Sequence, residues 1–255
     1  MCTLALFFQE MEDYPLIVAA NRDEFYARPS APPQWLSTDP KILGGKDLLA
    51  GGTWLGINEH GMLAGILNRK SEGKESPAAI RSRGLLCLDI LSARSPRAAR
   101  DLLRKENGAA YRPFNLLFAD REEAYIAYNE SEKISCVSLS QGFHVFGNKP
   151  VYESQSKKAD RARLLFSQLN DRFHNEGPNP LESIPDLRMV LSDHGPATSS
   201  DDPKDSICVH SQSYGTLSST LIFYCLAEGR LGNFHAPGPP CSASYGDPIW
   251  LEVPR

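Results

Sequence analysis

Residues 2–8, CTLALFF, and residues 15–21, PLIVAAN, are two apolar runs separated by the polar stretch QEMEDY (9–14). Apolar runs of this length with a polar turn between them indicate two strands joined as a β-hairpin. The segments GGTWLGIN (51–58) and GMLAGILN (61–68) repeat this pattern around Glu59-His60-Gly61. The N-terminal third therefore predicts antiparallel strands, with the proline-rich segment ARPSAPPQW (27–35) as a loop between the two hairpins.

Two helices are predicted after these strands, over residues 81–94 and 96–105. Ser95 is a candidate N-cap, and Pro96 follows at the first helical position, where a missing N–H costs little. The segments FNLLFAD, EAYIAYN and FHVFGN then predict three further strands up to residue 148.

The C-terminal part predicts helices first and strands last. Ala159, Ala162, Phe166 and Leu169 recur at helical spacing within residues 156–171, and a second helix is expected over residues 180–192. Residues 215–238 predict two strands about a turn at Glu228-Gly229.

Strands, then helices, then strands again differ from the βαβ alternation of a parallel sheet. The order of elements fits an α+β protein in which helices pack on antiparallel sheets. Because no internal repeat and no biased linker divides the sequence, we expect one domain over residues 1–255.

The net charge and the lengths of the apolar runs limit the kinds of binding partner that we expect. The net charge is −4, and no long Lys/Arg block is present to neutralise phosphates, so we expect no nucleic-acid partner. The longest apolar runs fall far short of the ~20 residues needed to span a bilayer. The N-terminus lacks the basic and apolar segments of a secretion signal, and we therefore expect a cytoplasmic protein. The sequence does not indicate an oligomeric state.

The six cysteines form no C-x-x-C, and their spacing indicates neither a zinc site nor a disulfide framework. For all but Cys2, a buried small hydrophobe is the preferred interpretation. The sequence also lacks G-x-G-x-x-G, a P-loop, G-x-S-x-G and H-E-x-x-H, and its six histidines are scattered singly. We therefore expect no metal site and no cofactor.

Cys2 directly follows the initiator methionine. If Met1 is removed, Cys2 carries both a thiol and a free α-amine with a pKa of about 8. That amine can serve as general base for the thiol of the same residue. Many proteins begin Met-Cys by chance, so this feature alone favours an ordinary first residue of a strand.

An ordered series of motifs favours a catalytic role for Cys2 over an ordinary strand residue. AANRDEFYARP (19–29), GGTWLGINEHGMLAGILNRK (51–70), FGN (146–148), RARLLF (161–166) and YGTLSST (214–220) follow the leading Met-Cys. Together they strongly resemble the NRDE family, also called the transport and Golgi organisation 2 (TANGO2) family. The resemblance extends from residue 1 to about 226, and its one noted departure in YGTLSST is Leu217, where the family usually has Arg.

That family is similar to the cysteine N-terminal-nucleophile (Ntn) hydrolases, which include penicillin V acylase and bile-salt hydrolase. The resemblance implies an αββα sandwich, two stacked antiparallel sheets between helix layers. It also implies site residues: Cys2 as nucleophile, Asp23 orienting its amine, Asn68 and Asn148 at the oxyanion, and Arg163 in the surrounding shell. Asn side-chain amides can donate to an oxyanion, and losing one such donor typically costs ~2.7–4 kcal/mol.

One position departs from the hydrolase pattern. Those enzymes have Arg directly before the Asn, where this chain has Ala20, and Arg22 lies inside the motif instead. If the strand continues, Arg22 shares a face with Ala20 and can replace the missing guanidinium. Asn21, Arg22 and Glu24 of the motif are candidate binding residues. The alternatives are a turn or cap role for Asn21 and Asp23, and a surface Arg22–Glu24 ion pair.

Two functions follow from the resemblance. The first is an Ntn-type cysteine amidohydrolase that cleaves a linear, non-peptide amide through an acyl-thioester on Cys2, with a small molecule as substrate. The second is a non-catalytic protein that binds and hands over a ligand, because the family is linked to haem trafficking and to lipid or acyl-CoA homeostasis. No C-x-x-C-H haem attachment motif is present.

Overall fold

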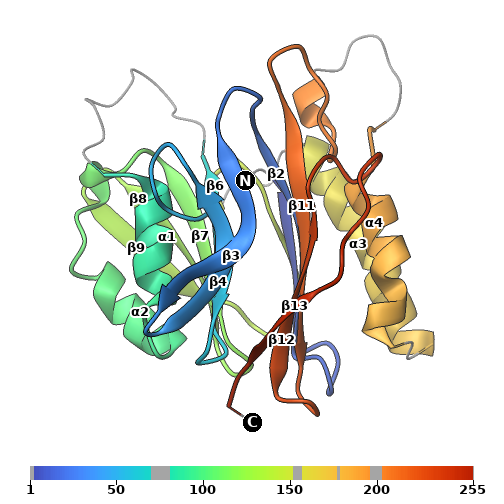
Figure 1. Ribbon diagram of the computed structural model, residues 1–255, viewed down its shortest axis with the longest axis horizontal. Helices are drawn as coiled ribbons and strands as arrows, with labels where there is room; N and C mark the ends of the chain where they lie inside the picture. The colour runs from blue at the N-terminus through green and yellow to red at the C-terminus, as the bar shows by residue number, and fades with distance from the viewer. Residues whose placement is uncertain (1–2, 70–80, 152–156, 177–178, 196–202, 255) are drawn as a thin grey trace. The chain divides into compact units, whose positions relative to one another are not determined.

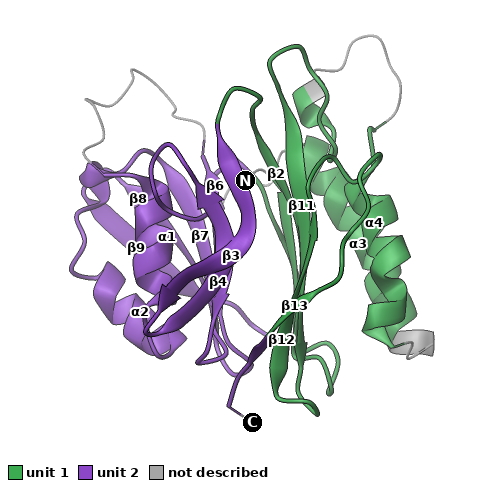
Figure 2. Cartoon of the chain, in the orientation of Figure 1, with its two compact units in different colours: residues 1–28, 141–147, 153–250 green, residues 29–140, 148–152, 251–255 purple. Residues whose placement is uncertain are grey.

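The computed structural model describes residues 3–69, 81–151, 157–176, 179–195 and 203–254. The chain forms two compact units, each assembled from separated segments (Figure 2). The first unit comprises residues 1–28, 141–147 and 153–250, and the second comprises residues 29–140, 148–152 and 251–255. Neither unit is a continuous stretch of chain, and the single domain expected over residues 1–255 stays a prediction.

The first unit is built on a six-stranded sheet with the strand order β10-β1-β2-β11-β12-β13. The pairs from β10 through β12 are antiparallel. The hairpin predicted at the N-terminus is confirmed, and its second strand continues four residues beyond the expected end, to Phe25. The strand bounds are β1 Thr3–Phe8, β2 Leu16–Phe25, β10 Gly142–Phe146, β11 Tyr214–Cys225, β12 Arg230–Ala236 and β13 Ile249–Glu252.

Helices α3 (Lys157–Glu176) and α4 (Ile184–Leu191) cover one face of this sheet (Figure 1). Alternate side chains of β1 face them, and the Phe7 ring lies 5.5 Å from that of Phe173 on α3. The helix predicted over residues 180–192 begins instead as a 3₁₀ turn, Pro180–Ser183, before α4.

The second unit is built on a seven-stranded antiparallel sheet whose strand order, β3 to β9, follows the sequence. Helices α1 (Arg83–Leu91) and α2 (Pro96–Leu103) pack on one face of it (Figure 1). The N-cap predicted at Ser95 is confirmed, since its hydroxyl accepts a hydrogen bond from the Ala98 N–H at 3.2 Å. The strand bounds are β3 Ser30–Thr38, β4 Lys41–Asp47, β5 Leu55–Asn58, β6 Leu63–Asn68, β7 Phe114–Ala119, β8 Ala124–Glu130 and β9 Lys133–Ser138.

The proline-rich loop expected over residues 27–35 is wrong, because most of it belongs to strand β3. β3 is an edge strand of its sheet, and its pairing register shifts between Ala31 and Gln34, the interval that holds Pro32 and Pro33. Proline cannot donate to a ladder, but an edge strand with a bulge does not need that donor. Strands β4, β9 and β13 were also absent from the sequence expectation.

The α+β class with antiparallel sheets and packed helices is confirmed. Both faces of β1 are buried, since every one of its residues is 3 % exposed or less. Among the described residues, no helix is both long enough and apolar enough to cross a membrane.

Candidate functional site

Strand β2 carries the Asn-Arg-Asp-Glu motif in its second half, beside the start of β1. Thr3, the first described residue of β1, pairs with Asn21 in the antiparallel ladder. Because strand side chains alternate between faces, Asn21 and Asp23 share the helix-covered face with Ala19. Arg22 shares the opposite face with Ala20, as expected if the strand continued.

Asp23 is a buried carboxylate held by two side chains from other elements. Its Oδ2 atom lies 2.7 Å from the Nζ atom of Lys158 on α3, and its Oδ1 atom accepts a hydrogen bond from the Thr216 hydroxyl at 2.6 Å. The side chains of Asp23 and Lys158 are only 1 % and 7 % exposed. A buried ion pair with additional hydrogen bonds has a fixed geometry, because losing either partner would leave an uncompensated charge.

Asn21 connects β2 to two backbone segments of the same unit. Its Nδ2 atom donates to the carbonyl of Leu191, the last residue of α4, at 2.8 Å and to the carbonyl of Ile207 at 3.0 Å. Helix ends leave carbonyls without intrahelical partners, and Asn21 satisfies one of them. Asn21 and Asp23 lie within β2, so the alternative that places them in a turn or cap at the end of a strand is wrong about their location. Asn21 nevertheless makes a capping contact, through its bond to the Leu191 carbonyl at the end of α4.

Arg22 and Glu24 do not form the surface ion pair considered above. Arg22 is only 4 % exposed. Glu24 instead accepts a hydrogen bond from the Phe25 N–H at 2.9 Å and lies 4.0 Å from the Arg28 guanidinium. An ion pair of that length near the surface contributes about 0–1 kcal/mol.

The structure does not bring Arg163 to Asp23. Arg163 lies on the exposed side of α3, where its guanidinium donates to Asp160 at 2.7 Å. Lys158, which the sequence interpretation missed, supplies the buried cation from the first turn of the same helix. The sequence could have indicated that Lys158 faces the sheet, because it lies four residues before Ala162 and therefore in line with the apolar stripe of the helix.

The YGTLSST segment lies on β11, next to β2, and contributes a second link. The Ser219 hydroxyl donates to the Ala20 carbonyl at 3.2 Å and lies 2.6 Å from the Tyr245 hydroxyl. Since the Ser219 proton goes to the carbonyl, the Tyr245 hydroxyl is the donor in the second bond. Burial raises the pKa of Tyr245, which keeps this proton in place at neutral pH.

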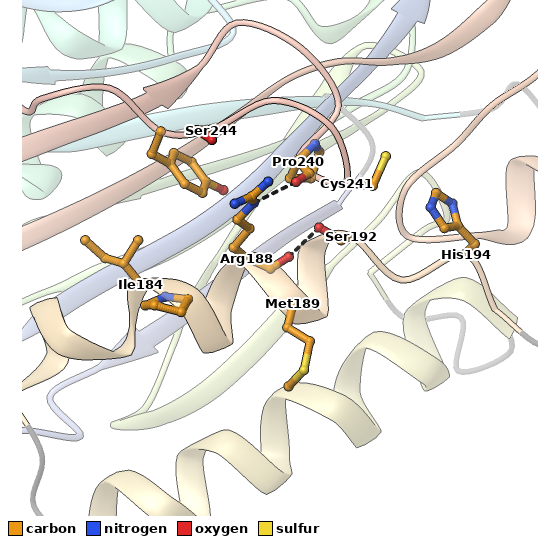
Figure 3. Close-up of a pocket in the computed structure, with 10 residues that line it drawn as sticks. Ile184, Arg188, Met189, Ser192, His194, Pro240, Cys241 and Ser244 are labelled. Atoms are coloured by element: carbon orange, nitrogen blue, oxygen red, sulfur yellow. Dashed lines mark hydrogen bonds between the residues drawn. The ribbon is translucent and has the colours of Figure 1, made fainter.

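Tyr245 is also part of the wall of a cavity of about 590 Å³ in the first unit (Figure 3). Arg188 of α4 also lines this cavity and donates a hydrogen bond to the Pro240 carbonyl at 2.8 Å. The remaining lining residues are Ile184, Pro185, Met189, Ser192, His194, Cys241 and Ser244, together with Pro240 itself.

Asn68 and Asn148, the predicted oxyanion donors, both belong to the second unit. Asn68 is the last residue of β6 and pairs with Phe114 of β7. The next residue of β7, Asn115, donates from Nδ2 to the carbonyl of Lys149 at 2.8 Å, which anchors the segment beginning at Asn148. Asn115 was not singled out from the sequence, although it is a buried amide within a strand.

Cys2, the predicted nucleophile, lies outside the described residues. Of the five described cysteines, Cys87, Cys208 and Cys225 are buried, as expected. Cys136 is only half-buried and Cys241 is exposed, which corrects the expectation for these two residues. Burial raises the pKa of Cys136 and of Cys225 to about 11. Their thiols are therefore protonated at neutral pH and are poor nucleophiles.

Four side chains with metal-ligating chemistry gather in the first unit, which the cysteine spacing did not predict. They are His194, Cys208, His210 and Cys241, and their ligand atoms all lie within 4.8 Å of one another. Cys208 and His210 are two residues apart, and the Sγ atom of Cys208 lies 3.7 Å from the Nε2 atom of His210. This C-x-H spacing is the one feature of the sequence that could have indicated the cluster.

Comparisons with known proteins agree with these observations. The sequence profile of the family described as Transport and Golgi organisation 2 matches residues 1–230. The chain is 30 % identical over 240 residues to the mouse Transport and Golgi organization 2 homolog and 28 % identical over 240 residues to the human homolog. Each alignment covers 82 % of both chains.

Two solved structures with a similar fold are named as a hydrolase and an acylase. A variant of conjugated bile acid hydrolase from Clostridium perfringens superposes with a TM-score of 0.64 at 13 % identity, covering 96 % of this chain and 92 % of that chain. Penicillin V acylase from Agrobacterium tumefaciens superposes with a TM-score of 0.56 at 14 % identity, covering 96 % and 86 %. At these identities the likeness establishes the Ntn-hydrolase fold.

Proposed function

Since the chain belongs to the transport and Golgi organisation 2 family and has the Ntn-hydrolase fold, we propose that it is an Ntn-type cysteine amidohydrolase acting on a linear, non-peptide amide. The observation that carries the proposal is the buried Asp23 carboxylate on β2. Lys158 and Thr216 hold it in one orientation, two residues along the strand from Asn21, the partner of Thr3.

The proposed reaction begins after removal of Met1, which frees the α-amine of Cys2. The amine takes the thiol proton, and the thiolate attacks the amide carbonyl carbon. The C–N bond breaks, the leaving amine takes the proton from the Cys2 ammonium, and an acyl-thioester remains on Cys2. Water then attacks the thioester, releasing a carboxylic acid and restoring the thiol.

Three other residues are assigned roles in this proposal. Asp23 accepts a hydrogen bond from the α-amine of Cys2 and orients it toward the thiol. Asn68 and Asn148 donate side-chain N–H groups to the oxyanion of the tetrahedral intermediates, each contributing about 2.7–4 kcal/mol of transition-state stabilisation. The shell role predicted for Arg163 is less favoured, because its guanidinium is engaged with Asp160 and Lys158 already neutralises Asp23.

The test is to measure amine release from a panel of N-acyl amides by protein whose intact mass shows loss of Met1. Penicillin V, a bile-acid amide and an N-acylethanolamine represent the substrates named for structural neighbours. We expect turnover with at least one of them, and a mass adduct on Cys2 equal to the acyl group. Cys2→Ala should abolish both signals, whereas Cys136→Ala, the matched control, should retain them. Turnover that survives in Cys2→Ala would contradict the mechanism.

A second candidate is favoured by the curated relatives, whose names refer to transport and Golgi organisation. In this case the protein binds and releases a ligand, haem or a lipid or acyl-CoA molecule, without cleaving it. A saturable shift of the haem Soret band, together with no acyl adduct on Cys2, would support this function over hydrolysis.

A further inference from the structure

The first unit contains a second cluster of chemically active side chains, separate from the Asp23 carboxylate. His194 follows α4, Cys208 and His210 lie on the segment that leads into β11, and Cys241 lies in the turn after β12. From the positions of their ligand atoms, we propose that these four residues bind a zinc-type divalent cation. No role in the proposed hydrolysis is assigned to any of them.

The distances within the cluster match the edges of a tetrahedron of ligands. The Sγ atoms of Cys208 and Cys241 lie 3.8 Å apart, and the Nε2 atom of His210 lies 3.7 Å from the former and 3.3 Å from the latter. With metal–sulfur bonds of about 2.3 Å and metal–nitrogen bonds of about 2.0–2.1 Å, tetrahedral edges are about 3.8 Å between sulfurs and about 3.6 Å between sulfur and nitrogen. Three protein ligands are therefore already at coordination distance.

His194 is the fourth residue of the cluster, with a ring nitrogen within 4.8 Å of the other three ligand atoms, and a backbone contact defines its tautomer. Its Nδ1 atom lies 3.1 Å from the Cys208 carbonyl oxygen, which can only accept, so Nδ1 carries the hydrogen. The Nε2 atom then has the free lone pair that a metal requires. An Nδ1–H bond to a carbonyl is a frequent way in which proteins orient a metal-binding imidazole.

Several bonds fix the segments that carry the ligands. The Cys208 N–H donates to the Asp193 carbonyl at 2.8 Å, and Arg161 binds the Asp193 carboxylate through two nitrogens at 2.5 and 2.6 Å. The Val209 N–H donates to the Thr216 hydroxyl at 2.9 Å, and Thr216 in turn donates to Asp23. A site whose ligands are held before binding loses little conformational entropy when the metal binds.

Ligand chemistry selects the class of metal. Two thiolates and two imidazoles form the Cys₂His₂ set that suits zinc, whereas calcium and magnesium prefer oxygen ligands. Two thiolates also balance the charge of a divalent ion. Cys208 is buried and the other three ligands are exposed, and His194 and Cys241 line the cavity shown in Figure 3. A chelator can therefore reach the bound metal without unfolding the protein.

The experiment uses Co²⁺ as a spectroscopic probe in the full chain without an affinity tag. We expect one equivalent of Co²⁺ to produce a thiolate-to-cobalt charge-transfer band and the visible bands of tetrahedral cobalt, and Zn²⁺ to abolish both. Cys241→Ser is the lead variant because this residue is exposed and its loss does not disturb the core; it should lower Co²⁺ affinity at least tenfold. Cys136→Ser, at a cysteine in the second unit, should leave affinity unchanged.

Three results would overturn the proposal. The first is the absence of a charge-transfer band in reduced wild-type protein, and the second is an equal loss of affinity in Cys136→Ser. The third is a Cys208–Cys241 disulfide in freshly purified protein that binds no cobalt after reduction. Cys2→Ala should bind Co²⁺ as the wild type does, so failure of the hydrolase proposal and failure of the metal site are distinguishable.

Discussion

The Nζ atom of Lys158 lies 2.7 Å from the Oδ2 atom of Asp23, and both side chains are almost completely shielded from solvent. The pair joins the first turn of α3 to the strand that carries the family's Asn-Arg-Asp-Glu motif. Burying two opposite charges is tolerated only when each is paired, so the contact holds this end of α3 on the sheet.

Lys158→Met tests this contact. The substitution leaves the Asp23 carboxylate buried without its cation, and we expect a loss of about 3–5 kcal/mol in the free energy of unfolding, measured by urea denaturation. Arg163→Ala, on the same helix, is the matched control, because its exposed pair with Asp160 should contribute less than about 0.5 kcal/mol. Equal losses in the two variants would contradict the buried pair.

Asn21→Leu should destabilise the first unit. It removes the amide that satisfies the Leu191 and Ile207 carbonyls, and each unsatisfied buried carbonyl costs about 1–3 kcal/mol. Amide hydrogen exchange around residues 207–210 should also become faster, since that segment loses an anchor.

Asn58→Leu offers a comparable change in the second unit, where the Asn58 Nδ2 atom donates to the Leu91 and Ala93 carbonyls at 2.7 and 2.9 Å. Its Oδ1 atom also accepts hydrogen bonds from the His60 and Met62 N–H groups, both at 3.0 Å. The substitution should therefore destabilise the protein at least as much as Asn21→Leu, without faster exchange at residues 207–210. If Asn58→Leu speeds exchange there as much as Asn21→Leu does, the anchoring role of Asn21 is wrong.

His235 predicts a pH dependence of stability. Burial lowers the pKa of this residue from 6.5 to about 4, and its Nδ1 atom lies 3.1 Å from the Thr220 hydroxyl. Between pH 6.5 and 4 the unfolded chain binds this proton and the folded chain does not. Stability should therefore fall as the pH is lowered through this window, and level off below it.

His235→Gln keeps a hydrogen-bonding side chain next to Thr220 but cannot titrate. The slope of the free energy of unfolding against pH, measured by denaturation at a series of pH values, should be shallower in this variant between pH 6.5 and 4. If the free energy of unfolding has the same pH dependence in the wild type and the variant, His235 is not the source of that dependence.

Gly52→Ala tests a close approach of two backbone segments. A Cβ atom at Gly52 would lie 2.1 Å from the carbonyl carbon of Gly84, and the Thr53 N–H donates to the Gly84 carbonyl at 3.0 Å. Since neither backbone can yield without breaking that bond, we expect a loss of at least about 1–3 kcal/mol, seen as a lower melting temperature. Gly246→Ala has no atom closer than 4.0 Å to the added carbon and should melt as the wild type does.

Local signals in the sequence determined much of the first sheet and most of the helices. Two apolar runs around a polar turn defined the β1–β2 hairpin, and Gly61 and Gly229 marked turns that the structure confirms, with φ values of 85° and 62°. Ser95 and Pro96 marked the start of α2. These features depend on residues close together in the chain, so their physical causes are visible in the sequence.

Tertiary structure decided what depended on distant partners. Pro32 and Pro33 lie in a strand because β3 is an edge strand, and Lys158 rather than Arg163 reaches Asp23 because only its face of α3 meets the sheet. Cys208 and Cys241 are 33 residues apart in sequence but lie 3.8 Å apart in space, on segments that flank the paired strands β11 and β12. The sequence by itself determined the family, the α+β class and the strand that carries the motif. Which charges and ligands meet was decided by packing between elements far apart in the chain, which local patterns do not encode.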